Sequence, residues 1–382
     1  MLKKIIIKNI NSIDYCEIDF KKGSYKFNEN NVIGDIVNPI ALYGHNGSGK
    51  TSVLTAMSYL IRLMIEPVET LVPFIVNNFK FDKYKNQRNK KIDLVTGSVN
   101  LSFDLDNVNY EYYIETTSLR YISKEYLKER NEVIFDRNDR MYKYNNEESQ
   151  LNNIFSLVPV LRLIASNNIN DVIIQKIYSY ISSFTFVNLP YINRGAFVTS
   201  KMFLNMSYYD LLVKNSNEVK EILKGYNEFP IYSIEKKDNL NISADPGAQY
   251  VLKIEGENFN GELPFNMISA GMKNQSILLS ILLSVPNNSV IFVDELEQAL
   301  HPSAIKSFLE VVQMKKIQFV FSSHNTYILQ MLRPDQIYFA KWEEGYSKYC
   351  RLSKIYPNIR EINNVEKMYL SSVFDEAIKN GK

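Results

Sequence analysis

The pattern of apolar and polar positions predicts strands and helices in alternation along the chain. A short apolar run at residues 40–43 suits a buried strand, and the residues after it carry apolar side chains at helical spacing up to Met64. Residues 2–20 alternate loosely, which predicts two strands that lead toward the strand at 40–43. The Glu66-Pro67 pair predicts a boundary after the first helix.

Residues 94–145 change to the period of two that is typical of strands. Two runs of alternating apolar residues, 99–105 and 108–114, flank an Asp106-Asn107 pair, and a second pair of runs flanks an Asn138-Asp139 pair. Short polar pairs between alternating runs are typical of β-hairpins. We therefore expect an antiparallel β-lobe inserted into the domain that contains the strand at 40–43.

Helical spacing returns after residue 151, and strands return after residue 229. Helices are predicted within 154–163, 172–181 and 211–223, and the lack of a sustained heptad repeat indicates a compact helical insertion and not a long coiled coil. Further strands are expected at 231–234, 250–254, 289–293 and 317–321, with a helix at 277–285. The predicted fold is α/β: residues 1–93 and 229–382 form the core, 94–145 the β-lobe and 146–228 the helical insertion.

The junction between the strand at 40–43 and the following helix carries a phosphate-binding loop pattern. It follows G-x-x-x-x-G-K-[ST], and the residues expected to bind nucleotide are Gly44, His45, Asn46, Gly47, Ser48, Gly49, Lys50, Thr51 and Ser52. Glycines let backbone N–H groups surround a triphosphate, the lysine reaches the β- and γ-phosphates, and the Thr51 hydroxyl is a ligand for Mg²⁺. The chain is therefore predicted to bind a nucleotide with Mg²⁺ within a P-loop NTPase fold.

Two carboxylates follow the apolar strand at 289–293. In phosphate-loop ATPases such a strand lies beside the loop strand, so Asp294 is predicted to hold Mg²⁺ together with Thr51. Glu295, directly after it, is a candidate catalytic base for the water that attacks the γ-phosphate. Glu297 is either a further acidic contact or a solvated residue at the start of a helix.

Another polar strand end follows the apolar run at 317–321. His324 stands there after two serines, and it is predicted to act in catalysis by hydrogen-bonding the γ-phosphate or the attacking water. The chain has 3 histidines, and all lie in or next to the predicted motifs, which favours this role over a partly buried structural one. His301, directly before Pro302, is either ligand-facing or a structural cap.

A serine and a glycine, Ser269 and Gly271, precede the predicted helix at 277–285. At a helix N-terminus this pair makes a second anion site without a glycine loop of its own. Because the chain already has one complete phosphate loop, such a site would serve a nucleotide held by another subunit. The alternative is that Ser269 is only a helix cap.

Composition and charge limit which binding partners and which cellular compartment we expect. A net charge of +2 over 382 residues gives no bulk argument for nucleic acid, although the basic residues between 80 and 91 form either a local patch or a solvated loop. The 2 cysteines, Cys16 and Cys350, offer no disulfide framework, which suits a reducing cytoplasm. The N-terminus suits a first strand and not a signal peptide, and no apolar run is long enough to span a bilayer. A cytoplasmic protein without a membrane segment is expected.

The order of these motifs resembles that of the ATPase heads of the ABC class, which includes the SMC, RecF and OLD proteins. The chain resembles more closely the bacterial AAA-type ATPases of abortive-infection and PARIS-like phage-defence systems. The segments that carry this resemblance are Ser269-Ala270-Gly271-Met272-Lys273, Asp294-Glu295-Leu296-Glu297, Leu300-His301-Pro302, Ser323-His324-Asn325 and residues 122–127, 333–339 and 366–370. It implies ATP as the nucleotide, His324 as a switch residue, and Ser269 and Gly271 as the signature that completes a partner's ATP site.

Several absences narrow this resemblance. The signature lacks the Leu-Ser-Gly-Gly-Gln form of transporters. The sequence identifies no glutamine-loop residue; Asn77 and Asn78 are candidates, and the choice stays open. Too few residues follow His324 for the TOPRIM nuclease domain of OLD proteins. The chain also lacks the Cys-x-x-Cys hook and the long coiled coil of chromosome-tethering SMC relatives.

The leading hypothesis is a slow or regulatory ATPase that forms head-to-tail homodimers, or higher oligomers, when it binds ATP. By resemblance, it senses phage infection and controls a separately encoded effector, with a toxic nuclease as the first candidate. One alternative is a DNA-binding repair ATPase of the RecF or SMC kind. A GTPase switch fits less well, because no clear Asn-Lys-x-Asp motif is present.

Overall fold

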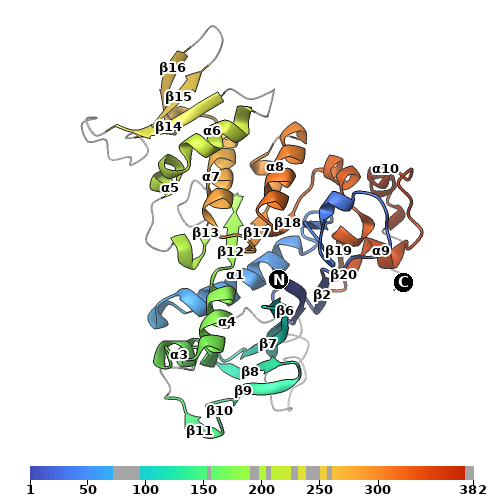
Figure 1. Cartoon of the computed structure of the whole chain (residues 1–382). Coiled ribbons are helices and arrows are strands. Elements are labelled where there is room, and N and C mark those ends of the chain that lie inside the picture. The colour runs from blue at the N-terminus through green and yellow to red at the C-terminus, as the bar shows by residue number, and fades with distance from the viewer. Residues whose placement is uncertain are drawn as a thin grey trace.

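A mixed seven-stranded β-sheet forms the centre of the molecule, and an eight-stranded and a three-stranded sheet lie on either side of it (Figure 1). The computed structural model describes residues 1–71, 95–152, 156–189, 198–203, 208–224, 231–237, 250–255, 260–300 and 302–374. The fold is α/β, as the sequence predicts. In these residues no helix has the length and the apolar character that a membrane crossing requires.

The central sheet has seven strands in the order β13-β12-β17-β18-β5-β19-β20. These strands are β5 (Ile40–Tyr43), β12 (Thr185–Asn188), β13 (Val198–Thr199), β17 (Val290–Asp294), β18 (Gln318–Ser322), β19 (Ile337–Glu343) and β20 (Tyr346–Arg351). The five inner strands run parallel, and β13 and β20 are antiparallel edges. Every residue of β5, β17 and β18 is buried, which explains why these strands are apolar except at their ends.

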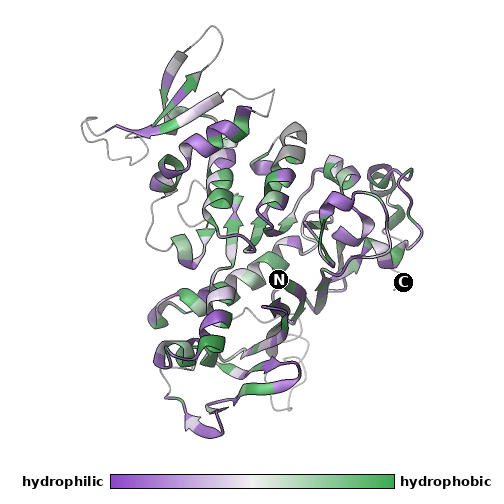
Figure 2. Ribbon diagram, in the orientation of Figure 1, coloured by the Kyte–Doolittle hydropathy of each residue, from purple (hydrophilic) through white to green (hydrophobic). Residues whose placement is uncertain are grey.

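Helices cover both faces of this sheet, so alternate strand residues belong to two different cores. Ile40 and Leu42 pack in the core that contains α1 (Lys50–Ile65). Ala41 and Tyr43 pack in the core that contains α7 (Ala270–Ser284) and α8 (Pro302–Met314). Figure 2 shows hydrophobic residues in the central strands and in α1 and α7, among other elements.

An eight-stranded antiparallel sheet lies at one end, in the order β11-β10-β9-β8-β7-β6-β1-β2. Its strands are β1 (Leu2–Lys8), β2 (Tyr15–Asp19), β6 (Thr96–Leu105), β7 (Val108–Thr117), β8 (Ile122–Glu129), β9 (Glu132–Asn138), β10 (Met141–Tyr144) and β11 (Glu147–Gln150). Both predicted hairpins are confirmed. Asp106 and Asn107 adopt φ values of 51° and 64°, the left-handed conformation that a two-residue hairpin turn needs.

One expectation about the N-terminal strands is wrong. Strands β1 and β2 do not lead into the sheet of β5, because β1 pairs with β6 and extends the β-lobe. The reason is the alternation of β1, which buries Ile5 and Ile7 in the same core as Val99 and Leu101 of β6. The lobe is therefore built from two separate stretches of the chain.

After the β-lobe, the chain forms helices and a third sheet. They are α3 (Val160–Asn167), α4 (Val172–Ser182), α5 (Tyr208–Lys214), α6 (Ser216–Lys224) and the strands β14 (Ile231–Lys236), β15 (Tyr250–Glu255) and β16 (Asn260–Pro264). The helices predicted within 172–181 and 211–223 are confirmed. Two strands of the same stretch, β12 and β13, belong to the central sheet. The sequence does not predict them, because the residues around them have helical spacing. The four-part division of the chain stays a prediction.

A buried carboxylate joins the β-lobe to these helices. Glu125 of β8 accepts hydrogen bonds from the first N–H groups of α3, those of Val160 and Leu161, at 2.6 and 3.0 Å. Tyr112 of β7 donates a third bond to the same carboxylate at 2.9 Å. An anion at a helix N-terminus is favourable. Glu125, in the segment 122–127 that carries part of the family resemblance, therefore has a structural explanation.

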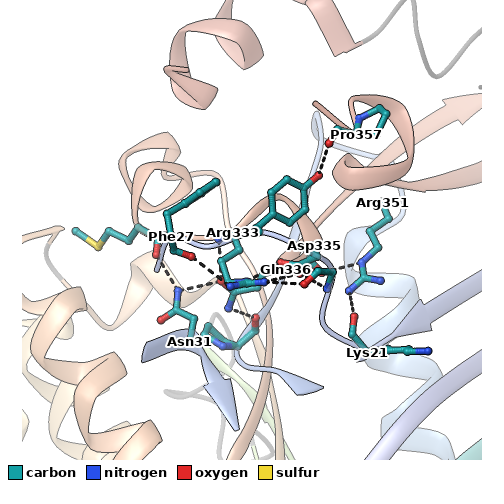
Figure 3. Close-up of polar contacts among 12 residues, drawn as sticks. Lys21, Phe27, Asn31, Arg333, Asp335, Gln336, Arg351 and Pro357 are labelled. Carbon is teal, nitrogen blue, oxygen red and sulfur yellow. Dashed lines mark hydrogen bonds and ion pairs between the residues drawn. The ribbon is translucent and has the colours of Figure 1, made fainter. Parts of the chain in front are cut away.

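A polar network closes the end of the central sheet where the parallel strands begin (Figure 3). Arg333 and Asp335 form an ion pair at 3.0 Å, and each side chain is only 1% exposed. Asp335 also accepts the N–H of Gly23, and Gln336 donates to the carbonyl of Pro39 directly before β5. This network ties the connection between β2 and β5, which includes β3 (Val32–Ile33) and β4 (Ile36–Val37), to the start of β19.

Candidate nucleotide-binding site

The loop between β5 and α1 has a backbone that only glycine fits well. Gly44, Gly47 and Gly49 adopt φ values of 150°, 76° and 103°. A Cβ atom on Gly44 would lie 2.3 Å from the carbonyl oxygen of Ala340, and one on Gly49 would lie 2.1 Å from Ser347 Oγ. Strands β19 and β20 therefore press directly against the loop and fix its path.

Lys50 closes this loop from the first turn of α1. Its side chain is buried, and Nζ donates to the carbonyl oxygens of Gly44 at 2.8 Å and His45 at 3.1 Å. Burial lowers the pKa of the Lys50 ammonium, and the nearby carboxylates of Asp294, Glu297 and Glu295 oppose this shift. A desolvated cation inside a ring of backbone groups is suited to bind a phosphate.

Two further hydroxyls of the loop fit the predicted ligands. Ser48 Oγ is buried and has no hydrogen-bond partner within the described residues, and such an unpaired polar atom fits a bound phosphate. Thr51 Oγ1 donates to Asp294 Oδ1 at 3.2 Å, so the two predicted Mg²⁺ ligands are neighbours. His45 and Asn46 are exposed, and Ser52 Oγ pairs with Ser12 Oγ at 2.9 Å behind the loop.

The residues present fit Mg²⁺ only as part of a complex with phosphate. In the part of the chain that the structure describes, no three His, Cys, Asp or Glu side chains gather closely enough to hold a metal ion. The Thr51 hydroxyl and the Asp294 carboxylate supply two oxygen ligands. Mg²⁺ is commonly bound by one or two protein oxygens plus substrate phosphates and water.

The predicted position of the strand that ends in Asp294 is wrong in one respect. Strand β17, which ends in Asp294, does not lie beside β5, because β18 lies between them. Thr51 nevertheless reaches Asp294, since α1 contacts both β17 and β18. The crossing helix, and not strand adjacency, brings the two halves of the site together.

Ser322 at the end of β18 holds the acidic pair in place, and the sequence reasoning missed it. Its Oγ donates to Asp294 Oδ1 and accepts the N–H of Glu295 at 2.9 Å. Burial raises the pKa of the Asp294 carboxyl, and the hydrogen bonds from Ser322 and Thr51 oppose that shift. The sequence does contain a signal for this role: a serine ends the apolar strand directly before Ser323 and His324. A hydroxyl at the end of a strand can form hydrogen bonds with the end of the strand beside it.

Glu295 has an unusual backbone for a residue with a side chain. Its φ and ψ are 55° and 60°, the left-handed conformation that is uncommon outside glycine. Residues held in this way concentrate at functional sites. The conformation turns the chain sharply after β17 into the short helix η8 (Leu296–Gln298), and Gln298 Nε2 donates to Glu295 Oε2 at 3.4 Å.

Glu297 connects the two strand ends. It accepts the hydroxyl of Ser323 at 2.8 Å and the N–H of His324 at 2.9 Å. Glu297 is therefore half-buried at the start of η8 and contacts the histidine segment, and a contact to the nucleotide itself stays a prediction. The side chain of His324 is exposed at the edge where β17 and β18 end. The structure thus brings Thr51, Asp294, Glu295 and Ser322 together and places His324 at the same edge.

The predicted signature caps its own helix and is open to solvent. Ser269 Oγ accepts the N–H of Met272 at 3.3 Å, and both Ser269 and Gly271 are exposed. A Cβ atom on Gly271 would meet nothing within 4 Å. Among the described contacts, none joins Ser269 or Gly271 to the phosphate loop of the same chain. Asn274 of α7 does donate to the carbonyl of Gln298 at 2.9 Å, which links this helix to the turn after Glu295.

The sequence matches, over residues 40–330, a family described as "AAA domain, putative AbiEii toxin, Type IV TA system". The chain belongs to this AAA family. The matched range spans the phosphate loop, Ser269 and Gly271, the acidic pair and His324, so the residues described above lie within the AAA domain. No curated protein matches the sequence.

The fold was also compared with solved structures. An SMC head domain from Thermotoga maritima covers 92% of this chain and 98% of its own, with 13% identity and a TM-score of 0.45. An SmcHead bound to the C-winged helix domain of ScpA covers 91% and 96%, with 14% identity and a TM-score of 0.49. An Smc head with an extended coiled coil, bound to a ScpA domain derived from Pyrococcus furiosus, covers 92% and 97%, with 13% identity and a TM-score of 0.43.

Ser322→Ala in this AAA domain should lower ATP turnover about tenfold and the free energy of unfolding by about 1–3 kcal/mol. The reason is that the N–H of Glu295 loses its acceptor, and Asp294 Oδ1 keeps only the longer bond from Thr51. Steady-state turnover and urea unfolding measure the two effects. Ser289→Ala is the matched control, because its buried hydroxyl bonds the Pro286 carbonyl at the opposite end of β17. It should lower stability without changing turnover; equal turnover losses would contradict the assignment.

Four further predictions fall outside the described residues. They are His301, the two glutamine-loop candidates Asn77 and Asn78, and the basic residues between 80 and 91. Each stays a prediction.

Proposed function

We propose that this AAA domain binds and hydrolyses ATP and dimerises head to tail when ATP is bound. The observation that carries the proposal is the convergence, at one edge of the parallel strands, of Lys50, Thr51, Asp294 and Glu295. They come as two adjacent pairs, from the start of α1 and the end of β17, and hydrogen bonds hold each of them in place. Ligands of open α/β sheets bind outside the carboxyl ends of the strands, which is where these groups lie.

The roles follow from the chemistry of the groups. Backbone N–H groups of the loop, with Lys50 and Ser48, hold the phosphates, and Thr51 with Asp294 holds Mg²⁺. When bound, Mg²⁺ neutralises charge on the phosphate oxygens. Glu295 is the base that orients and deprotonates the attacking water, and His324 contacts the γ-phosphate or that water. The hydroxyl of Ser322 keeps Asp294 and Glu295 in fixed relative positions.

The exposed signature supports dimerisation. Ser269 and Gly271 stand at the open N-terminus of α7, a 15-residue helix whose positive end favours an anion. Two apolar side chains nearby, Met267 and Leu263, are 73% and 42% exposed and could be covered by a second subunit. In a head-to-tail dimer these residues would cover the nucleotide of the other subunit. ATP would favour the closed dimer by its higher affinity for that state.

We further propose that the ATPase acts in defence against phages by controlling a separately encoded effector, with a nuclease as the first candidate. The family description, which names a putative AbiEii toxin and a type IV toxin–antitoxin system, supports this role. Copurification with the product of the neighbouring gene is the expected result, and a lack of association would count against it. Salt-dependent DNA binding that stimulates turnover would instead favour a DNA-binding repair ATPase.

ATP turnover and ATP binding together test the enzymatic part. Glu295→Gln should lower turnover at least about 100-fold, because an amide cannot accept the proton, and should retain ATP binding within about twofold. Glu310→Gln makes the same chemical change at an exposed position on α8 and should change neither quantity. Undiminished turnover in Glu295→Gln would remove Glu295 from the proposed mechanism.

A further inference from the structure

The backbone segment that carries His324 is anchored to the phosphate-loop strand. Tyr43, the last residue of β5, directly precedes Gly44, and its hydroxyl donates to the carbonyl of Asn325 at 2.9 Å. The side chain of Asn325 then caps the short helix η9 (Thr326–Met331) by accepting the N–H of Tyr327 at 3.0 Å. The start of η9 is therefore tied to the residue before the loop.

The C-terminal helix α10 (Val365–Leu370) holds the same segment from another side. Glu366 uses both carboxylate oxygens: Oε1 accepts the hydroxyl of Thr326 at 2.7 Å, and Oε2 accepts the amide of Gln330. Tyr369 of α10 packs edge-on against Tyr43, with ring centroids 6.1 Å apart. It also stacks on Phe339 of β19 at 5.4 Å and 13°. Glu366 therefore bonds η9 while Tyr369 packs on β5.

Two carboxylates thus hold the short stretch from His324 to Thr326. Glu297, from the turn after β17, accepts the N–H of His324, and Glu366, from α10, accepts the hydroxyl of Thr326 two residues later. A side chain is placed accurately when the backbone on both sides of it is fixed. Because the imidazole of His324 is exposed, its position depends on these bonds to the backbone and side chains beside it.

We propose that Glu366 is a positioning residue for His324, so that the C-terminal helix α10 controls nucleotide turnover without touching the nucleotide. This inference rests on the proposed function, because it assumes that His324 acts in ATP hydrolysis. It gives a role to the segment 366–370, which the nucleotide site itself does not use. It also predicts that a change in the seating of α10 alters turnover while the phosphate loop keeps its affinity for ATP.

The test is a double-mutant cycle on the full chain between Glu366 and His324, read as kcat and as the dissociation constant of ATP. Glu366→Ala should lower kcat about tenfold and leave ATP affinity within about twofold, since Lys50 is not affected. In the His324→Ala background the same change should have no further effect on kcat. Glu366→Gln should recover most of the activity, because an amide still offers an oxygen to Thr326.

Two additional variants separate positioning from general destabilisation. Glu361→Ala removes an exposed acid from the same C-terminal segment and should leave kcat unchanged. Thr326→Ala removes the bond to Glu366 from the other side and should reproduce the loss in kcat, even if Glu366→Ala folds poorly. Equal kcat in wild type and Thr326→Ala, or equal losses from Glu366→Ala with and without His324, would overturn the proposal. A wild-type chain without any ATP turnover would instead overturn the proposed function on which it rests.

Discussion

Lys50→Met should lower the affinity for ATP about 100-fold while leaving the fold intact. The ammonium of Lys50 is the buried cation of the phosphate loop, and its bonds to the Gly44 and His45 carbonyls keep it inside the loop. Losing a charged hydrogen-bond donor to a phosphate costs about 2–3 kcal/mol, and 2.7 kcal/mol corresponds to about 100-fold in affinity. Isothermal titration with ATP and Mg²⁺ measures the change.

Stability is the informative companion measurement for this variant. Burial of the ammonium costs solvation energy, which its lowered pKa reflects, so its removal should change the free energy of unfolding by less than about 1 kcal/mol. Lys22→Met removes one positive charge at an exposed position near the other end of the sheet, and it should affect neither quantity. ATP affinity unchanged in Lys50→Met would contradict the assignment of the phosphate loop.

Arg333→Met should lower the free energy of unfolding by about 3–5 kcal/mol. The reason is that the carboxylate of Asp335 stays buried after its partner is removed, and an uncompensated buried charge is costly. The carbonyl oxygens of Gly23 and Phe27 lose a donor as well (Figure 3). Urea unfolding followed by circular dichroism measures the loss.

A surface ion pair provides the contrast for this prediction. Lys348 and Glu343 on the β19–β20 hairpin also form an ion pair, but their side chains are 55% and 27% exposed. Lys348→Met should therefore cost less than about 1 kcal/mol. If both variants lost the same stability, burial would not be the cause. Because the Arg333 network lies at the end of the sheet opposite the phosphate loop, ATP affinity of folded Arg333→Met should remain near that of the wild type.

The sequence predicted elements well where one period dominated. Strands β6 and β7 alternate cleanly around Asp106-Asn107, and each was predicted to within three residues at its outer end. Strand β5 is uniformly apolar before its glycine loop and was predicted to the residue. The predictions failed where partners far apart in the chain decide the outcome. The pairing of β1 with β6, across about ninety residues, depends on which buried faces match, and the periodicity of β1 alone does not show this.

The same limit applied to the candidate site. Lys50, Thr51 and Asp294 were predicted because their motifs are local and their chemistry is specific. Ser322 was missed because its role depends on β18 lying between β5 and β17, and strand order is not written in any local pattern. Glu297 was left open for a related reason. Its two acceptor bonds reach Ser323 and His324, which follow it by more than twenty residues.

The measurement that tests the central claim most directly is the mass of Glu295→Gln by light scattering, with and without ATP and Mg²⁺. We expect ATP to convert a monomer into a dimer, or to tighten an existing assembly. Adding Ser269→Arg should abolish this effect, while Ser166→Arg, at an exposed serine of α3, should not. A Glu295→Gln protein that binds ATP yet stays monomeric, or a Ser269→Arg variant that assembles as before, would contradict the composite site. The chain would then act as a simpler phosphate-loop switch within one subunit.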